Sequence, residues 1–198
     1  VFGFLNYLPI SKHFHILMAF PNVYFSKLEP AGKFSSSQQV TEEIKAIMDP
    51  SYQPVEDENA PKRFGARDVT DLSWKSLMDA YTCTECGRCT AVCPANITGK
   101  KLSPRKVLMD IRDRAEEVGL KIESGHEEYA KDKSKPVSKD NFDDGKSLFD
   151  YTTPEELHAC TTCNACVEAC PVLINPLEPI LKMRRYEILT LSQGPQDW

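Results

Sequence analysis

The sequence predicts a mainly α-helical fold in which helices frame two cysteine-rich loops. Two observations lead to this prediction. The chain contains two runs of four cysteines with one common spacing, C-x2-C-x2-C-x3-C-P. Helix-start signals stand beside the runs: Ser103-Pro104 offers an N-cap serine followed by proline at the first helical position, and Thr153-Pro154-Glu155-Glu156 reads as a capping box. The two halves of the chain therefore repeat one order of helix, cysteine run, proline and helix.

The N-terminal part, residues 1–27, is the most apolar stretch of the chain. Pro9, Lys12, His13 and His15 interrupt it, so it has no unbroken run of about 18 apolar residues, and it lacks the order of charged, apolar and small residues typical of a signal peptide. The missing initiator Met suggests a processed or truncated start. We interpret this arm as the interfacial end of a membrane segment or as a strip that a partner covers. The alternative is an apolar arm packed on its own domain.

A polar segment rich in Pro, Ser and Glu follows over residues 28–67. This composition predicts an extended linker with a short helix around 42–48. The third part, residues 68–198, contains both cysteine runs and is predicted to form the helical domain.

Four longer helices are predicted in that domain, one before and one after each cysteine run. The segment between the two middle helices is rich in Lys and Asp, which predicts a solvated loop. Two arginines of the last helix, Arg184 and Arg185, are expected either near a cysteine loop or facing water. The predicted helices cover about 71–81, 103–118, the segment from 153 to the second run, and 177–191, and the loop covers 123–146.

The chain is mildly acidic, with a formal net charge of −5 over 198 residues. Because nucleic-acid binding calls for a basic patch, we do not expect nucleic acid as a partner. We also find no Gly-rich dinucleotide loop and no nucleophile–base pair. The sequence therefore offers no catalytic substrate site of its own, and whether the chain is an enzyme by itself is left open.

All eight cysteines belong to the two runs. A disulfide scaffold would spread its cysteines along a small secreted chain, structural zinc prefers two separated pairs, and a redox dithiol does not account for the third and fourth cysteines of a run. Two runs of four, each closed by proline, match the ligand loops of two [4Fe–4S] clusters. The runs are Cys83, Cys86, Cys89 and Cys93, and Cys160, Cys163, Cys166 and Cys170.

The spacing also predicts how the cysteines are shared. Three closely spaced thiolates can cover one face of a cubane, and in two-cluster ferredoxins the fourth cysteine of each run ligates the other cluster. We therefore assign each run's first three cysteines to one cluster and exchange the fourth. The first set is Cys83, Cys86, Cys89 and Cys170, and the second set is Cys160, Cys163, Cys166 and Cys93.

Charge near the runs predicts a difference between the two clusters. A [4Fe–4S]²⁺ core with four thiolates carries a charge of about −2, so basic neighbours favour its reduction. Arg88 lies inside the first run, whereas the second run contains Glu168. We expect the first cluster to have the higher reduction potential, and the alternative is that these charges are ordinary solvated side chains. Further basic residues after the first run are Lys100, Lys101 and Arg105.

Two segments carry a resemblance to a known family. They are WKSLMDAYTCTECGRCTAVCPANITGKKLSPRKVLMDIRD and HACTTCNACVEACPVLINPLEPILKMRRYEIL. Together they resemble the iron–sulfur subunit of heterodisulfide-reductase-related oxidoreductases over about residues 71–191. They are also similar to the iron–sulfur subunit of anaerobic glycerol-3-phosphate dehydrogenase and, more distantly, to the cluster domain of succinate dehydrogenase. The resemblance implies an α-helical ferredoxin fold with two [4Fe–4S] clusters.

The N-terminal arm carries a second resemblance. Many relatives fuse the cluster domain to a membrane part similar to the haem b subunit of respiratory nitrate reductase, and LPISKHFHIL resembles the end of its last spanning helix. The resemblance offers His15 as a haem ligand, with His13 as the alternate. The preceding helices, which would supply the second axial histidine, are not in this sequence. We therefore favour an interfacial polar role for His15 over haem b in this chain alone.

The resemblance implies partners as well. One is a catalytic subunit, either a flavoprotein or a protein with cysteine-rich CCG domains, and another is a membrane subunit with a haem or quinone site. The chain is then expected at the membrane surface, on the cytoplasmic side of the inner membrane. Our hypothesis is an electron-transfer subunit of a membrane-associated respiratory oxidoreductase. The alternatives are a soluble ferredoxin-like carrier and a module whose clusters are structural only.

Overall fold

The computed structural model describes residues 1–11, 13–30, 33, 38–49, 52 and 64–194, and in these the regular structure is helical. One isolated antiparallel bridge joins Ala130 to Phe142. The prediction of a mainly α fold is confirmed. The α-helices are α1 (Phe2–Tyr7), α2 (Phe14–Tyr24), α3 (Gln38–Met48), α4 (Trp74–Thr82), α5 (Arg88–Ala91), α6 (Pro94–Ile97), α7 (Pro104–Ser124), α8 (Pro154–His158), α9 (Ala165–Glu168) and α10 (Leu177–Arg185). Short 3₁₀ turns lie at Leu8–Ile10, Val69–Asp71, Glu127–Tyr129 and Leu148–Asp150, and a π-helix covers Tyr186–Thr190.

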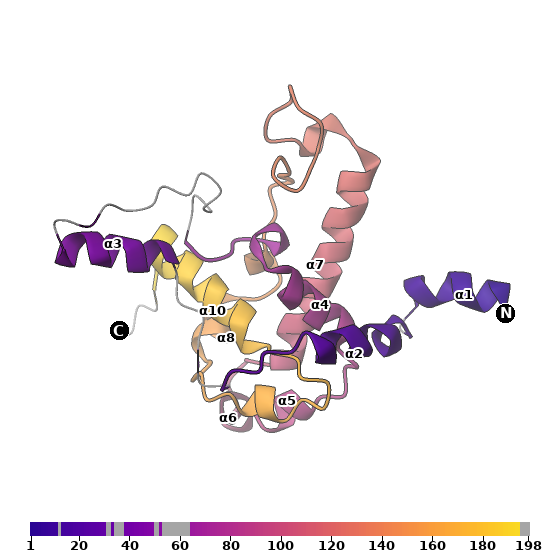
Figure 1. Ribbon diagram of the computed structural model, residues 1–198, viewed down its shortest axis with the longest axis horizontal. Coiled ribbons are helices and arrows are strands. Elements are labelled where there is room, and N and C mark those ends of the chain that lie inside the picture. The colour runs from indigo at the N-terminus through magenta and orange to yellow at the C-terminus, as the bar shows by residue number, and fades with distance from the viewer. Residues whose placement is uncertain (12, 31–32, 34–37, 50–51, 53–63, 195–198) are drawn as a thin grey trace.

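Helix α7 is the longest helix, and both α4 and α5 pack against it (Figure 1). Its start follows the predicted signal, because the Ser103 side chain accepts a hydrogen bond from the Lys106 N–H at 3.3 Å and Pro104 occupies the first turn. The helix ends at Gly125 with a left-handed φ of 64°, so it is longer than the predicted 103–118. The cysteine loops lie at its N-terminal end and the 125–146 loop at its C-terminal end (Figure 1).

The hydrophobic core lies between α7, α8 and α10. Helix α8 begins with the predicted capping box: Thr153 accepts from the Glu156 N–H at 3.3 Å, and Glu156 accepts from the Thr153 N–H at 2.8 Å. Apolar side chains with almost no exposed surface fill the space between the helices. They include Leu102, Val107, Ile111, Leu148, Leu157, Ile180 and Met183.

Most of the 123–146 segment is exposed, as its composition predicted, but it begins with the last residues of α7 and its C-terminal part packs on the domain. Its Phe142 is 5 % exposed and packs into the core. Its Asp144 accepts two hydrogen bonds of 2.7 Å from Arg114 of α7, whose side chain is fully buried. Asp68 accepts from the same guanidinium at 2.6 Å. A buried charge survives only when it is paired and hydrogen-bonded, so this loop is held to α7 by an ion network that charge counting alone could not reveal.

The last predicted helix, 177–191, is α-helical as far as Arg185 and ends in a π-helix over Tyr186–Thr190. The Ala66 N–H donates to the Lys182 carbonyl oxygen at 2.9 Å, so residues 64–66 lie against α10. A Cβ at Gly65 would lie 2.3 Å from both the Lys182 oxygen and the Tyr186 nitrogen. Only glycine allows this close approach, which coincides with the start of the π-helix at Tyr186. The division into residues 1–27, 28–67 and 68–198 stays a prediction.

The N-terminal arm packs one face of α2 on α4. Asn22 is fully buried there. Its side chain donates to the Val172 carbonyl oxygen at 3.0 Å and accepts from the Lys75 ammonium at 2.9 Å. Phe25 stacks edge-on against Trp74. Part of the arm is thus packed on its own domain, as the alternative interpretation stated.

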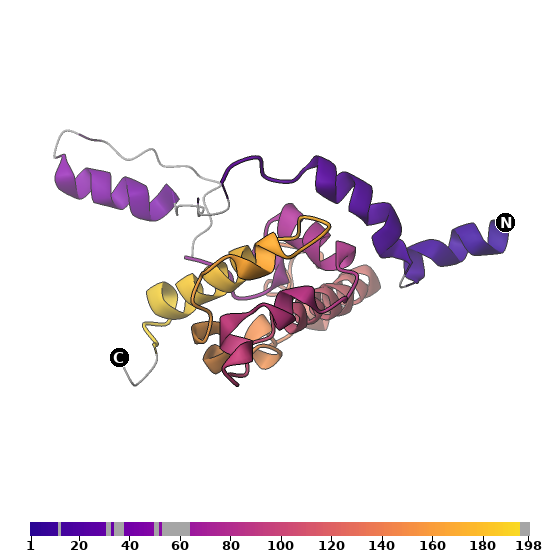
Figure 2. The same ribbon diagram turned by 90° about the horizontal axis from the view of Figure 1, so that it is seen from below.

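Helix α1 and the outer face of α2 remain apolar and exposed, and they extend away from the helical domain (Figure 2). Their exposed residues include Phe2, Phe4, Leu5, Tyr7, Ile16, Leu17, Phe20 and Tyr24. Across the described part of the chain, no helix combines the length and apolarity needed to cross a membrane. In the linker, α3 begins earlier than the short helix predicted around 42–48.

Candidate metal centre

The two cysteine loops share one backbone conformation. The third residue of each run, Glu85 and Thr162, has a left-handed φ of 56°, and the fifth, Gly87 and Asn164, has φ of 79° and 61°. Such conformations are costly for residues other than glycine and cluster at functional sites. Here they orient backbone N–H groups toward sulfur. The Glu85 N–H donates a hydrogen bond to the Cys83 sulfur, and the Thr162 N–H donates one to the Cys160 sulfur.

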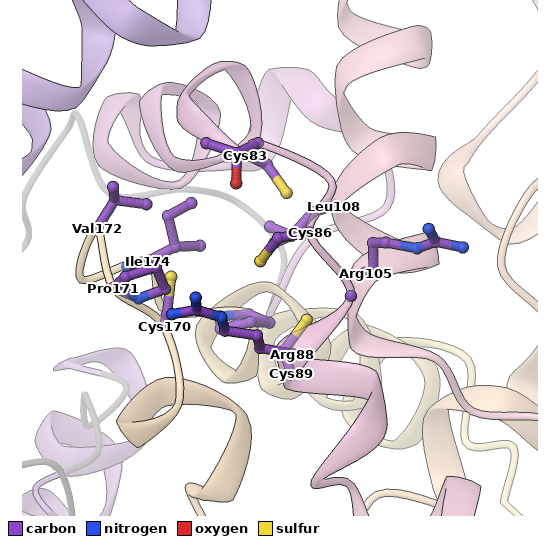
Figure 3. Close-up of a pocket in the computed structure, with 13 residues that line it drawn as sticks. Cys83, Cys86, Arg88, Cys89, Arg105, Leu108, Cys170, Pro171, Val172 and Ile174 are labelled. Carbon is purple, nitrogen blue, oxygen red and sulfur yellow. Dashed lines mark hydrogen bonds between the residues drawn. The ribbon is translucent and has the colours of Figure 1, made fainter.

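The structure brings Cys83, Cys86 and Cys89 together with Cys170 of the other run. These four side chains line one open cavity, whose free space of about 360 Å³ includes open solvent. In Figure 3 their sulfur atoms surround a common space between the first loop and the segment that carries Cys170. The apolar walls come from Leu108 of α7 and from the segment after Cys170, and they include Pro171, Val172, Ile174 and Pro176.

The other four cysteines form a second group beside the first. Charges on Cys93 and Cys163 raise the thiol pKa of both Cys160 and Cys166. A charge on Cys160 also raises the pKa of Cys166. Helix α5 contacts α9, and these helices carry Cys89 and Cys166. The Cys166 thiol also responds to the charge of Cys89. The two groups of cysteines are therefore neighbours across the α5–α9 contact.

Burial sets the chemistry of these thiols before metal binds. Burial, together with the charge of neighbouring thiolates, raises the pKa of Cys83 to about 11 and that of Cys166 to about 12. By contrast, the Arg88 N–H lowers the pKa of the exposed Cys86. Four thiolates therefore repel one another inside a low-dielectric site and need compensating positive charge. An iron–sulfur core supplies that charge, since a coordinating thiol is deprotonated outright.

The residues present fit the cluster ligands. Each [4Fe–4S] cluster takes four thiolates, and the first cavity presents four thiols and no competing carboxylate among its lining residues. Within the described residues, no group of three or more His, Cys, Asp or Glu side chains is placed to hold a single metal ion. When bound, the clusters would supply one-electron redox chemistry, and the chain's part is to orient, hydrogen-bond and shield them.

Two contacts around the cysteines tune this environment. The Ile174 N–H donates to the Cys170 sulfur at 3.4 Å, and such hydrogen bonds affect reduction potential. Arg112 of α7 donates to Glu85 at 2.9 Å and so supports the strained first loop. Sequence reasoning did not find Arg112, because a charged residue on a long helix is usually solvated.

The prediction for Arg184 left two alternatives, and the structure places this residue beside the second loop. Its guanidinium donates to the Leu157 carbonyl oxygen at 2.8 Å through Nε and to the Cys160 carbonyl oxygen at 2.5 Å. The positive charge of Arg184 acts to lower the pKa of the Cys160 thiol. Arg184 therefore anchors the start of the second cysteine run to α10.

The remaining predicted residues lie in different places. Arg88 and Arg105 line the first cavity, whereas Lys100 and Lys101 are not among its lining residues. His15 lies on α2 in the N-terminal arm and is not among the residues that line the cysteine cavity. Its haem-ligand role stays a prediction.

Comparison with protein families identifies the class. Residues 82–174 match the model of a 4Fe-4S dicluster domain, and residues 41–98 match a second model with the same description. The chain therefore contains a 4Fe-4S dicluster domain, as iron–sulfur subunits of oxidoreductases do. It binds two [4Fe–4S] clusters, and it has an electron-transfer role. No solved structure matches it.

Individual relatives support this assignment. The chain is similar to a probable iron-sulfur-binding oxidoreductase FadF of Bacillus subtilis, with 34 % identity over 98 % of this chain and 27 % of that protein. It is similar to an EtfAB:quinone oxidoreductase of Syntrophomonas wolfei, with 31 % identity over 98 % of this chain and 26 % of that protein. A probable membrane-anchored ferredoxin of Chromohalobacter salexigens is 36 % identical over 71 % of this chain and 20 % of that protein.

The chain thus spans about a quarter of the length of the first two relatives. A more distant match, 25 % identical over 75 % of this chain and 60 % of the relative, is a heterodisulfide-reductase-like protein of Archaeoglobus profundus. The sequence resemblance to heterodisulfide-reductase-related iron–sulfur subunits is confirmed.

Proposed function

We propose that this chain relays electrons through two adjacent [4Fe–4S] clusters held by crossed sets of cysteines. The first set is Cys83, Cys86, Cys89 and Cys170, and the second is Cys160, Cys163, Cys166 and Cys93. The observation that carries the proposal is the cavity lined by three cysteines of the first run and the last cysteine of the second. A crossed arrangement ties both loops to both clusters and keeps the clusters close together, as stepwise electron transfer requires.

Exposure supports a relay over a purely structural role. The second cysteine of each run, Cys86 and Cys163, is exposed, whereas Cys93 and Cys166 are buried. Each cluster would therefore have an edge near solvent, while the thiols between the clusters are shielded. A structural staple needs no exposed edge, but a relay needs one entry and one exit.

The chain's place in a larger assembly is also a proposal. The exposed apolar residues of α1 and α2 favour association with a membrane surface or a membrane subunit. The names of two relatives, an EtfAB:quinone oxidoreductase and a membrane-anchored ferredoxin, agree with this setting. We propose that the chain moves electrons between a flavoprotein or CCG-domain subunit and a membrane quinone or haem site, on the cytoplasmic side of the inner membrane.

Anaerobic redox titration followed by low-temperature EPR tests the relay. The protein is loaded with iron and sulfide, reduced stepwise with dithionite and reoxidised. The proposal expects two reversible one-electron reductions per chain and a broadened spectrum when both clusters are reduced, because neighbouring paramagnets interact. Clusters that cannot be reduced without losing iron would instead support a structural role.

The soluble-carrier alternative is tested by purification. A membrane-associated relay is expected to remain with the membrane fraction and its partner subunits when cells are broken anaerobically at low salt. Recovery of a monodisperse, cluster-containing chain in the detergent-free supernatant would support a soluble carrier.

A further inference from the structure

The exposed edge of the first cavity carries two arginines. Arg88 lies one residue before the ligand candidate Cys89, and Arg105 lies in the first turn of α7. Both are exposed, and both line the cavity that holds the four thiols of the first set. Figure 3 shows the Arg88 guanidinium reaching across the front of this space toward Cys170, while Arg105 projects outward on the other side of Cys86.

These two charges differ from those of Arg112 and Lys101, which are paired, and from that of Lys100, which is not among the residues that line the cavity. Arg112 is paired with Glu85 and Asp113, and Lys101 is paired with Glu155. Within the described part of the chain, no carboxylate lies within ion-pair distance of Arg88 or Arg105. Both charges are exposed at the edge of the cavity that also contains Cys86, the most exposed thiol of this group.

The edge of the second cysteine loop has the opposite character. Its exposed thiol, Cys163, lies between Thr162 and Asn164, which are neutral. The exposed charge on the neighbouring helix α9 is Glu168. The two proposed ends of the relay therefore differ in sign, basic at the first cluster and acidic at the second.

We infer that Arg88 and Arg105 form a docking edge for an acidic redox protein, which exchanges single electrons with the first cluster. This inference rests on the proposed relay. Electron-transfer complexes are small and transient, so opposite surface charge mainly raises the association rate and sets the orientation. Because the chain and its clusters carry net negative charge, an acidic partner would be repelled elsewhere. The two arginines make this edge the favoured point of approach.

Charged inorganic oxidants test the docking edge without the native partner. The cluster-loaded, dithionite-reduced protein is mixed in a stopped-flow instrument with tris(oxalato)cobaltate(III), an anion, or with hexaamminecobalt(III), a cation. Each cobalt(III) accepts one electron from the reduced protein and becomes cobalt(II). The variant is R88Q/R105Q. The control is K133Q/K139Q, which removes the same charge from the loop at the far end of α7.

We expect R88Q/R105Q to slow oxidation by the anion about tenfold at an ionic strength of ~0.01 M, and by less than about twofold at ~0.5 M. Oxidation by the cation should not slow. A redox-inert anion, hexacyanochromate(III), should compete with the anionic oxidant in the parent protein and lose this effect in the variant. Calorimetric titration with the same inert anion measures its binding without any electron transfer. R88K/R105K should keep the parent behaviour.

Equal anion rates and equal competition in R88Q/R105Q and K133Q/K139Q would overturn the docking edge. Iron and sulfide content is measured for every variant. If the double variant binds clusters poorly, R105Q alone, outside the cysteine run, should still slow the anion about threefold at low ionic strength. Clusters that cannot be reduced would refute the relay itself, whereas reducible clusters without a charge preference would refute only the docking edge.

Discussion

Asn22 donates a hydrogen bond of 3.0 Å to the carbonyl oxygen of Val172, and so joins the N-terminal arm to the wall of the first cysteine cavity. The same side chain accepts from Lys75, which also pairs with Asp79 at 2.6 Å. Asp79 in turn accepts from the Asn175 N–H at 3.4 Å. A buried polar chain thus connects α2, α4 and the loop after Cys170.

Replacing Asn22 by Leu should weaken this connection. The substitution keeps the volume but leaves the Val172 oxygen without its donor and removes one of the two partners of Lys75, which keeps Asp79. We expect a cost of about 1–3 kcal/mol in the free energy of unfolding. Denaturant unfolding measures the loss, and EPR should show a change in the first cluster. As a control, Asn6→Leu removes a hydrogen bond on the exposed helix α1 and should cost less than about 0.5 kcal/mol. Equal stability of the two variants would contradict a structural role for Asn22.

Arg184 should tune the second cluster. Arg184→Met removes a positive charge and three hydrogen bonds at the start of the second run, two to the Leu157 carbonyl oxygen and one to that of Cys160. Because positive charge favours the reduced cluster, the midpoint potential of the second cluster should fall, on the order of tens of mV. Potentiometric EPR measures this shift, and the first cluster should keep its potential.

Two further variants separate charge from general destabilisation. Lys182→Met removes one charge from the same helix, where it pairs with Glu178 at 3.5 Å, and should leave both potentials near their parent values. Arg184→Lys keeps the charge, so the midpoint potential of the second cluster should lie between that of Arg184→Met and that of the parent protein. A shift of the same size in the Lys182 variant would show that Arg184 has no special position.

Gly65 should tolerate no side chain. Gly65→Ala places a Cβ 2.3 Å from two backbone atoms of α10 and the π-helix at a φ of 77°. The chain must separate from α10 there, and we expect a loss of about 2 kcal/mol or more in the free energy of unfolding. Gly119→Ala is the matched control, because no atom lies within 4 Å of its Cβ position in α7. Alanine is the better helix former, so this variant should gain up to about 1 kcal/mol.

Glu117 makes stability depend on acid pH. Hydrogen bonds from Lys121 and Tyr151 lower the pKa of this carboxyl to about 2 from its usual 4.5. A lowered folded pKa stabilises the protein above the unfolded pKa, and the contribution disappears as pH falls from 4.5 toward 2. The difference in unfolding free energy between the parent protein and Glu117→Gln should therefore be constant from pH 5.5 to 7 and shrink below pH 4.5. A difference that grows on acidification would contradict this assignment.

Sequence reasoning succeeded where a local rule decides the structure. Ser103 and Thr153 cap helices as their residue types predict, because a cap depends only on its own turn. The spacing of the cysteines predicted two clusters, and the family models agree. The division of cysteines between the clusters remains a proposal, although the first cavity is lined by the predicted set.

Features that depend on contacts between distant segments could not be predicted from the sequence. In the sequence, Arg114 resembles a solvated residue of a charged helix. It is buried in the fold because Asp68 and Asp144, from distant segments, pair with its guanidinium. The left-handed φ of Thr162 is unfavoured for a β-branched residue, so local preference predicts the opposite of what the loop requires. The Gly65 contact likewise exists only after α10 has packed.

Crossed ligation is the central claim, and the fourth cysteine of each run tests it. Cys86→Ser and Cys163→Ser each change one cluster that the sequence assigns without crossing, and so provide reference EPR spectra for damage to the first and the second cluster. Cys170→Ser and Cys93→Ser are then compared with these references, in protein loaded with iron and sulfide under identical conditions.

The deciding measurement is the EPR spectrum of dithionite-reduced Cys170→Ser. Crossed ligation predicts that its spectrum shows the damage seen in Cys86→Ser, with the second cluster intact, although Cys170 belongs to the second run. If the Cys170→Ser spectrum instead matches that of Cys163→Ser, each run binds its own cluster and the crossed arrangement is wrong.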